Sequence, residues 1–166
     1  MYKKLTWVSL LLSWPLCSYS ANLTEMNFQW LMKNQTKVEK ILSSDNPSDA
    51  IPLINTLGTL WKYKDGAIWV EVAPSIATAL MFHNQSMLTW FSKHPQVWQD
   101  WLSDFPTALF TNWSGNSSET KQLEALREQM LSRFKQYSQS GTDLGLVEMN
   151  RALYRRILES EIREID

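Results

Sequence analysis

The two histidines, His83 and His94, are the first residues that could take part in chemistry, because imidazole binds metals and transfers protons near neutral pH. The chain contains no other histidine, and its single cysteine is Cys17. Structural metal sites usually need four nitrogen or sulfur ligands with close pairwise spacing. We therefore expect no metal site. We expect both histidines to lie near the carboxyl ends of helices, where a positive imidazole is favoured.

Ser118 and Lys121 have the spacing of a serine nucleophile and its lysine partner. The further motifs that accompany such a pair are missing from the chain, as are a Gly-x-Ser-x-Gly turn and a Gly-rich phosphate loop. Ser118 is better explained as the residue that caps the start of a long helix. We expect neither nucleophilic catalysis nor a bound cofactor.

Glu71 is the carboxylate with the most suggestive setting, because Val70, Val72 and the nearby Trp69 could shield it from water. Enzymes that cleave glycans can work with one or two such acids, so catalysis by Glu71 is an open alternative. On a helix, however, Glu71 would lie beside the apolar stripe and face solvent. Asp100 and Asp104 lie four residues apart, and we expect them on a solvated helix face.

Tryptophan is the most distinctive residue type. The chain has nine tryptophans, and all but Trp7 and Trp14 follow the first twenty residues. Several crowd together with phenylalanines between residues 90 and 113, and one helix face cannot bury all of them. Exposed aromatic side chains act as interface anchors or as platforms for sugar rings. The candidate interface residues are therefore Trp90, Phe91, Trp98, Trp101, Phe105, Phe110 and Trp113.

The first twenty residues have the order of a secretory signal peptide: a positive start with Lys3 and Lys4, an apolar run, then small residues. This order predicts cleavage after Ser20. The apolar run of about twelve residues is shorter than the roughly twenty that span a bilayer, so we expect no stable membrane insertion. Cys17 leaves a lipoprotein open, although the two residues before it are not the small ones expected there.

Charge and cysteine content narrow the class of protein further. Removing Lys3 and Lys4 from the 16 basic residues leaves 14 against 17 acidic residues, a net charge of −3. Such a chain is not expected to bind nucleic acid, which needs a surplus of basic residues. Residues 21–166 contain no cysteine and therefore no disulfide. Five Asn-x-Ser/Thr triplets, several in expected helices, suit a host that does not glycosylate them, which favours a bacterial periplasm.

Apolar residues recur at steps of three and four along most of the chain, which is typical of helices. We expect a helix over 23–43 capped by Asn22, and a second helix capped by Asp49. Two short helices carry a repeated Trp-apolar-Ser-x-x-Pro pattern and should end before Pro95 and Pro106. A loop over 114–118 precedes a long helix, and a last helix begins near Thr142 or Asp143.

Residues 60–72 allow two interpretations. Alternation on both sides of Asp65-Gly66 fits a β-hairpin. An isolated hairpin is only marginally stable, and the chain shows no other strand pattern. We therefore expect two helices here, the second one kinked or starting late near Pro74.

Together these patterns predict a signal peptide over 1–20 and a single all-α domain over 21–166. The domain should contain six to eight short and medium helices, packed as helical hairpins or as an α-α superhelix. We expect an exported, periplasmic, non-enzymatic protein that binds another protein, for example an inhibitor or immunity-type protein acting on a toxin or cell-wall enzyme. The alternatives are a small peptidoglycan-acting enzyme that uses Glu71, and a structural or assembly factor of the cell envelope. The sequence points to no particular small-molecule ligand.

Overall fold

The computed structural model describes residues 17–64, 66 and 68–165, so most of the predicted signal peptide lies outside the described residues. Within these residues the chain forms a compact all-α fold of eight helices with almost no strand. The predicted fold class is confirmed. In chain order the elements are α1 (Cys17–Lys33), α2 (Gln35–Leu42), α3 (Pro47–Lys62), α4 (Ile68–Phe82), α5 (Asn84–Ser92), α6 (Pro95–Leu109), β1 (Thr111–Asn112), α7 (Ser117–Ser140), α8 (Leu144–Leu158) and β2 (Arg163–Glu164).

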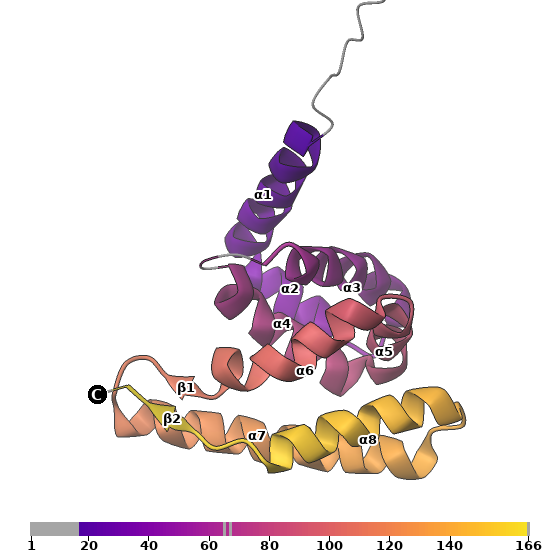
Figure 1. The fold of residues 1–166 in the computed structure, drawn as a ribbon, viewed down its shortest axis with the longest axis vertical. Coiled ribbons are helices and arrows are strands. Elements are labelled where there is room, and N and C mark those ends of the chain that lie inside the picture. Colours follow the sequence, from indigo (N-terminus) through magenta and orange to yellow (C-terminus); the bar gives the residue numbers. More distant parts are fainter. Residues whose placement is uncertain (1–16, 65, 67, 166) are drawn as a thin grey trace, which may run out of the picture.

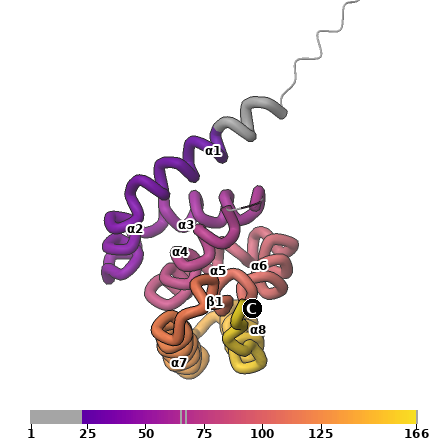
Figure 2. The backbone as a smooth tube through the Cα atoms, turned by 90° about the vertical axis from the view of Figure 1, so that its left-hand side faces the viewer, coloured from indigo at the N-terminus to yellow at the C-terminus, as the bar shows by residue number. Residues whose placement is uncertain are grey.

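Helix α4 is the centre of the fold, and it packs against α2, α3, α5, α6 and α7. It can do so because it is apolar on nearly all sides, as expected for a helix surrounded by others. Helices α7 and α8 form an antiparallel hairpin along one side of the molecule (Figure 1). Toward its amino-terminal end α1 projects away from the body (Figure 1), and the coloured part of α1 does the same in the perpendicular view (Figure 2).

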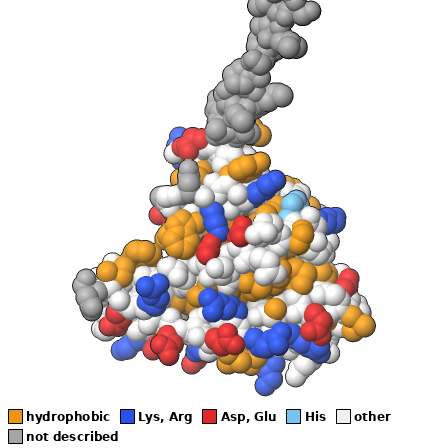
Figure 3. Space-filling view, viewed as in Figure 1, with side chains coloured by type: hydrophobic (Ala, Val, Ile, Leu, Met, Phe, Trp, Pro, Cys, Tyr) orange, Lys and Arg blue, Asp and Glu red, His pale blue; other side chains and the backbone are white. Residues whose placement is uncertain are grey.

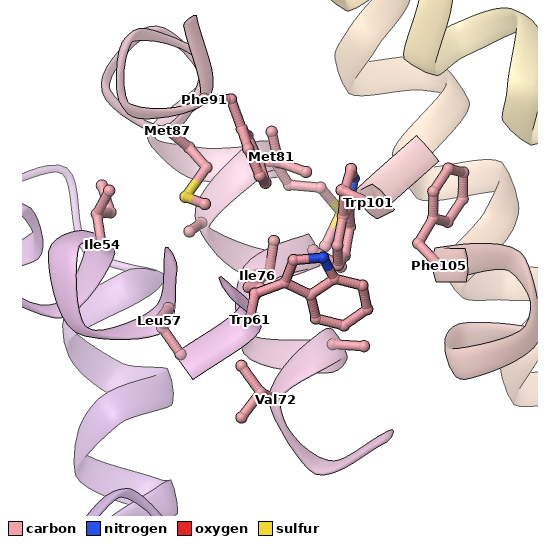
Figure 4. Packing of buried hydrophobic residues seen from close by; sticks show 14 of the residues in the cluster. Ile54, Leu57, Trp61, Val72, Ile76, Met81, Met87, Phe91, Trp101 and Phe105 are labelled. Atoms are coloured by element: carbon pink, nitrogen blue, oxygen red, sulfur yellow. The ribbon is translucent and has the colours of Figure 1, made fainter. Parts of the chain in front are cut away.

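The hydrophobic core joins side chains from α3, α4, α5 and α6 (Figure 4). At its centre the rings of Trp61 and Trp101 meet edge to face with centroids 4.8 Å apart. Trp101 also stacks on Phe105 at 5.3 Å. Offset and edge-to-face aromatic pairs of this kind stabilise a core beyond the area that they bury.

Three asparagine or aspartate side chains cap helices. Helix α8 begins next to Asp143, close to its predicted start, and the Asp143 side chain caps it by accepting a hydrogen bond from the amide of Leu146. The caps predicted at Asp49 and Ser118 are wrong. Asn46 caps α3 in place of Asp49, and Asn116 caps α7 in place of Ser118. The earlier start of α3 is favoured because Pro47, which has no N–H to satisfy, becomes the first helical residue.

The single helix predicted over 23–43 is broken at Asn34, and Asn22 lies inside α1 rather than at its start. The side-chain Nδ2 of Asn34 donates to the carbonyl of Trp30 at 2.7 Å. Such local side-chain bonds compete with the backbone bonds of a helix. The break turns α2 toward the body, where Val38 and Leu42 are buried.

Three prolines lie inside helices: Pro52, Pro74 and Pro106. The expected end of a helix before Pro106 is wrong, since α6 continues to Leu109. A proline at position 106 cannot donate to the carbonyl of Leu102. The side chain of Arg156 in α8 donates to this carbonyl instead, from Nε at 3.1 Å. Tertiary contact therefore compensates for the missing backbone bond.

The stretch over 60–72 forms helices, not a hairpin: α3 ends at Lys62 and α4 begins at Ile68. Gly66 between them has a φ of 41°, a conformation that glycine adopts readily. Asp65 and Ala67 lie outside the described residues. Helix α4 runs through Pro74 and does not start late there.

Two short parallel strands, which the sequence pattern did not reveal, bring the end of the chain back to the connection between α6 and α7. Thr111 pairs with Arg163, and Asn112 pairs with Glu164. Each strand has only two residues, too few for a visible alternation. The side chain of Arg127 in α7 donates to the carbonyls of Ile157 and Leu158 at the end of α8. These contacts hold the last segment against the α7–α8 hairpin.

Candidate functional site

The structure separates the seven aromatic interface candidates into two groups. Trp113 is 52% exposed and Trp90 is half-buried. The other five are buried in the core: Phe91, Trp98, Trp101, Phe105 and Phe110. A buried ring offers no surface to a partner, so these five are corrected from interface candidates to core residues.

The five rings are buried because several elements share them. Phe91 contacts the rings of both Trp98 and Trp101, which links α5 to α6. Phe105 contacts Phe110 beyond the end of α6. One helix face alone could not bury so many rings. These rings are nevertheless buried, because α3, α4 and α5 supply additional surface.

Trp90 is held in one orientation at the surface of α5. Its indole lies against α3 at Gly58, where an added Cβ atom would lie 2.5 Å from the ring carbons. The imidazole of His94 stacks on it with ring centroids 4.0 Å apart. His94 Nδ1 donates to the carbonyl of Trp90 at 2.8 Å, since a carbonyl can only accept. The ring is thus fixed before any partner binds.

A groove of about 500 Å³ opens beside Trp90, between α3 and α5; we call it the α3–α5 groove. Ile51 and Ile54 form its apolar wall from α3. Gln85, Ser86 and Thr89 line it from α5. A volume of this size, with an aromatic ring and a few polar groups, is typical of binding pockets.

Charge in the groove differs from that of the chain as a whole. Lys93 lines the α3–α5 groove, and none of its described lining residues is a carboxylate. The chain itself has a formal net charge of −1. Elsewhere the visible face carries a mixture of basic and acidic side chains, with hydrophobic side chains gathered near its middle (Figure 3). A local excess of positive charge favours an anionic ligand.

The sequence-predicted catalytic candidates lie apart from this groove. Glu71 is exposed on α4, and the described structure gives its carboxylate no hydrogen bond or ion pair. Asp104 forms an ion pair with Lys64, whereas Asp100 accepts a hydrogen bond from Gln96. Both aspartates are half-buried, so the expectation that they lie on a solvated helix face is wrong.

His83 and His94 lie between consecutive helices, immediately after the end of α4 and shortly after the end of α5, as predicted. Ser118 and Lys121 are exposed on the first turns of α7. Over residues 17–64, 66 and 68–165, no group of three or more His, Cys, Asp or Glu side chains could hold a metal ion. None of the described helices combines the length and the apolar character needed to cross a bilayer.

No protein-family model matches the chain, and neither a curated protein nor a solved structure matches it. Function must therefore be inferred from the residues and their geometry.

Sequence reasoning selected Trp90 but missed the residues that make its surroundings a groove. Ile51 and Ile54 belong to the apolar stripe of α3, and nothing in their spacing shows that Ile51 lies at the surface. Gly58 carried one usable signal, because a glycine inside an apolar helix often marks a close approach of another group. Lys93 had no distinguishing signal, since surface lysines are common.

Proposed function

We propose that the protein is exported to the periplasm and acts there by binding another protein at the α3–α5 groove. The protein is still expected to be a non-enzymatic binding protein. Its proposed binding surface lies at Trp90 and not at the buried aromatic cluster. An inhibitor or immunity-type protein needs such a surface.

The observation that carries the proposal is the fixed position of Trp90 at the mouth of an open groove. Tryptophan is enriched among the few residues that dominate binding energy at interfaces. A ring already held by Gly58 and His94 loses little conformational freedom on binding, so less entropy opposes association.

The positive charge of Lys93 in the wall of the groove favours a partner that carries negative charge. Lys93 and His94 line the groove without a neighbouring carboxylate among the described lining residues. Ile51, Ile54 and Trp90 offer apolar contact. The expected occupant is an acidic segment of a partner protein that places one aliphatic or aromatic side chain against Trp90.

Selection from a library of random short peptides, displayed on phage, tests this proposal with the protein expressed from its full-length gene. We expect the selected peptides to be enriched in Asp and Glu together with a large apolar residue. The Trp90→Ala variant should bind them at least about tenfold more weakly, which is the effect of removing an interface anchor. Lys93→Glu should weaken binding in a manner that depends on salt.

Trp113→Ala is the matched control, because it removes the other surface tryptophan of the candidate set and should leave peptide binding unchanged. Far-ultraviolet circular dichroism verifies that each variant is folded. The proposal fails if no acidic peptide is selected, or if the selected peptides bind Trp90→Ala as well as the unaltered protein.

A further inference from the structure

A second pocket adjoins the α3–α5 groove and shares Gln85 and Ser86 with it. It lies between the junction of α4 and α5 on one side and α7 on the other. Its volume is about 340 Å³, within the range of small-molecule sites. The side chains with polar chemistry in its wall include His83, Asn84, Arg133 and Tyr137.

Asn84 presents an unused acceptor at this pocket. Its Nδ2 donates to the carbonyl of Leu80 and to Oδ1 of Asn150, both at 3.0 Å. Asn150 is itself anchored, since its Nδ2 donates to the carbonyl of Phe134 and to Oγ of Ser138, both at 2.7 Å. This network fixes the orientation of the Asn84 amide. Its Oδ1 is left without a partner although the residue is only 9% exposed.

His83 also has a buried polar atom without a hydrogen-bond partner. It is 6% exposed, and its Nε2 has no hydrogen-bond partner in the described structure. An unpaired buried polar atom destabilises a protein, so two of them beside one pocket call for an explanation. Both residues line the pocket, but neither atom is open to solvent. Contact with a ligand therefore requires the side chains that cover these atoms to move, a rearrangement that is common on binding.

Arg133 supplies positive charge to the pocket. In the described part of the chain its guanidinium makes no hydrogen bond or ion pair, but it lies over the ring of Phe82 at 5.1 Å. A cation–π contact holds a guanidinium in place and leaves its N–H groups free. The phenol of Tyr137 is a hydrogen-bond donor at neutral pH, like any tyrosine, and burial, followed by the charge of Asp143, raises its pKa further. None of the described lining residues is a carboxylate.

From these groups we infer that the pocket binds a small carboxylate that carries an N–H donor next to its acid group. The carboxylate would bind to the Arg133 guanidinium and the Tyr137 hydroxyl. The N–H would donate to Oδ1 of Asn84. This is the chemistry of an α-amino acid or of an N-acylated amino acid, such as the end of a short peptide. The inference does not depend on the partner proposed for the α3–α5 groove.

Titration calorimetry of the full-length protein with three related probes tests the inference. N-acetylalanine has both the carboxylate and the N–H, acetate lacks the N–H, and N-acetylalanine amide lacks the carboxylate. We expect N-acetylalanine to bind at least about tenfold more tightly than the other two, because each lacks one hydrogen-bonded group. Free alanine then distinguishes an α-amino acid from an N-acylated amino acid as the ligand, since it carries an ammonium in place of the amide.

Arg133→Gln removes the positive charge from an exposed position of α7 and should not affect folding. We expect it to weaken the binding of N-acetylalanine at least about tenfold, as for a lost charge-assisted hydrogen bond. Lys135→Gln, also exposed on α7 but outside the pocket, is the matched control and should bind normally. The inference is overturned if N-acetylalanine does not bind, if all three probes bind equally, or if Arg133→Gln binds as tightly as the unaltered protein.

The two proposals fail separately. Trp90→Ala should leave the affinity for N-acetylalanine unchanged, because Trp90 does not line this pocket. Arg133→Gln should leave peptide binding at the α3–α5 groove unchanged, because Arg133 does not line that groove.

Discussion

The side chain of Arg156 donates from Nε to the carbonyl oxygen of Leu102, at 3.1 Å, although 54 positions separate the two residues in the chain. Pro106 cannot donate to this carbonyl, which would otherwise be left without a partner. One contact thus allows α6 to continue through a proline. It also fastens α8 to the helix that carries Trp98, Trp101 and Phe105.

Arg156→Ala should lower the free energy of unfolding by about 1–3 kcal/mol, because the carbonyl of Leu102 loses its donor. Urea denaturation measures the change. Pro106→Ala restores an N–H in α6, so Arg156→Ala should have a smaller effect in that background. Strictly additive effects of the two substitutions would contradict the compensation.

Gly58→Ala should destabilise the protein by about 1–3 kcal/mol, because the new methyl group would lie 2.5 Å from the Trp90 ring. The same substitution in a Trp90→Ala background should be neutral or stabilising by up to about 1 kcal/mol, since alanine is the better helix former. Thermal unfolding of the unaltered protein, the two single variants and the double variant measures the coupling between Gly58 and Trp90. If Gly58→Ala destabilised both backgrounds equally, Trp90 would not be the group that requires glycine.

The two tryptophans at the extremes of burial should respond oppositely to truncation. Trp101 is 0% exposed, so Trp101→Ala should lower the free energy of unfolding of the protein by about 3–5 kcal/mol. Trp113→Ala should change stability by no more than about 0.5 kcal/mol, as for most surface substitutions. Urea denaturation, monitored by circular dichroism, compares the two variants. A large loss of stability in Trp113→Ala would show that Trp113 is not a surface residue.

Tyr137 should make stability depend on pH in the alkaline range. Burial, with a smaller contribution from Asp143, raises its pKa above the ordinary value in the unfolded chain. The unfolded chain therefore releases this proton first, so stability is intact below the ordinary tyrosine pKa of about 10 and falls as the pH rises from there through the raised pKa. Denaturation midpoints across this range measure the effect. Tyr137→Phe should have a smaller alkaline loss, and an unchanged pH profile would refute the assignment.

Expression of the full-length gene in a Gram-negative host should yield a periplasmic protein whose amino-terminal residue is Ala21. The expectation follows from cleavage after Ser20 at the end of a signal peptide. Fractionation and amino-terminal sequencing give the result. A protein that stays in the cytoplasm and retains residues 1–20 would contradict it, whereas a lipid on Cys17 would identify the lipoprotein alternative.

Helical periodicity predicted the fold class correctly because buried stripes repeat every three or four residues whichever helices later cover them. It was less accurate at the ends of helices. Asn34, Asn46 and Asn116 determine three of these ends through side-chain bonds to nearby backbone groups. Asparagine is common both inside and between helices, so its position alone did not distinguish these roles.

The sequence by itself determined that this protein is helical, where most helices lie, and that Trp90 belongs among the candidate surface residues. Only the tertiary structure decided that Phe91 and Trp101 are buried while Trp90 lines a groove. It alone brought Asn84 and Arg133 to one pocket. The physical reason is that periodicity records which face of a helix is apolar, whereas burial depends on which distant segment packs against that face.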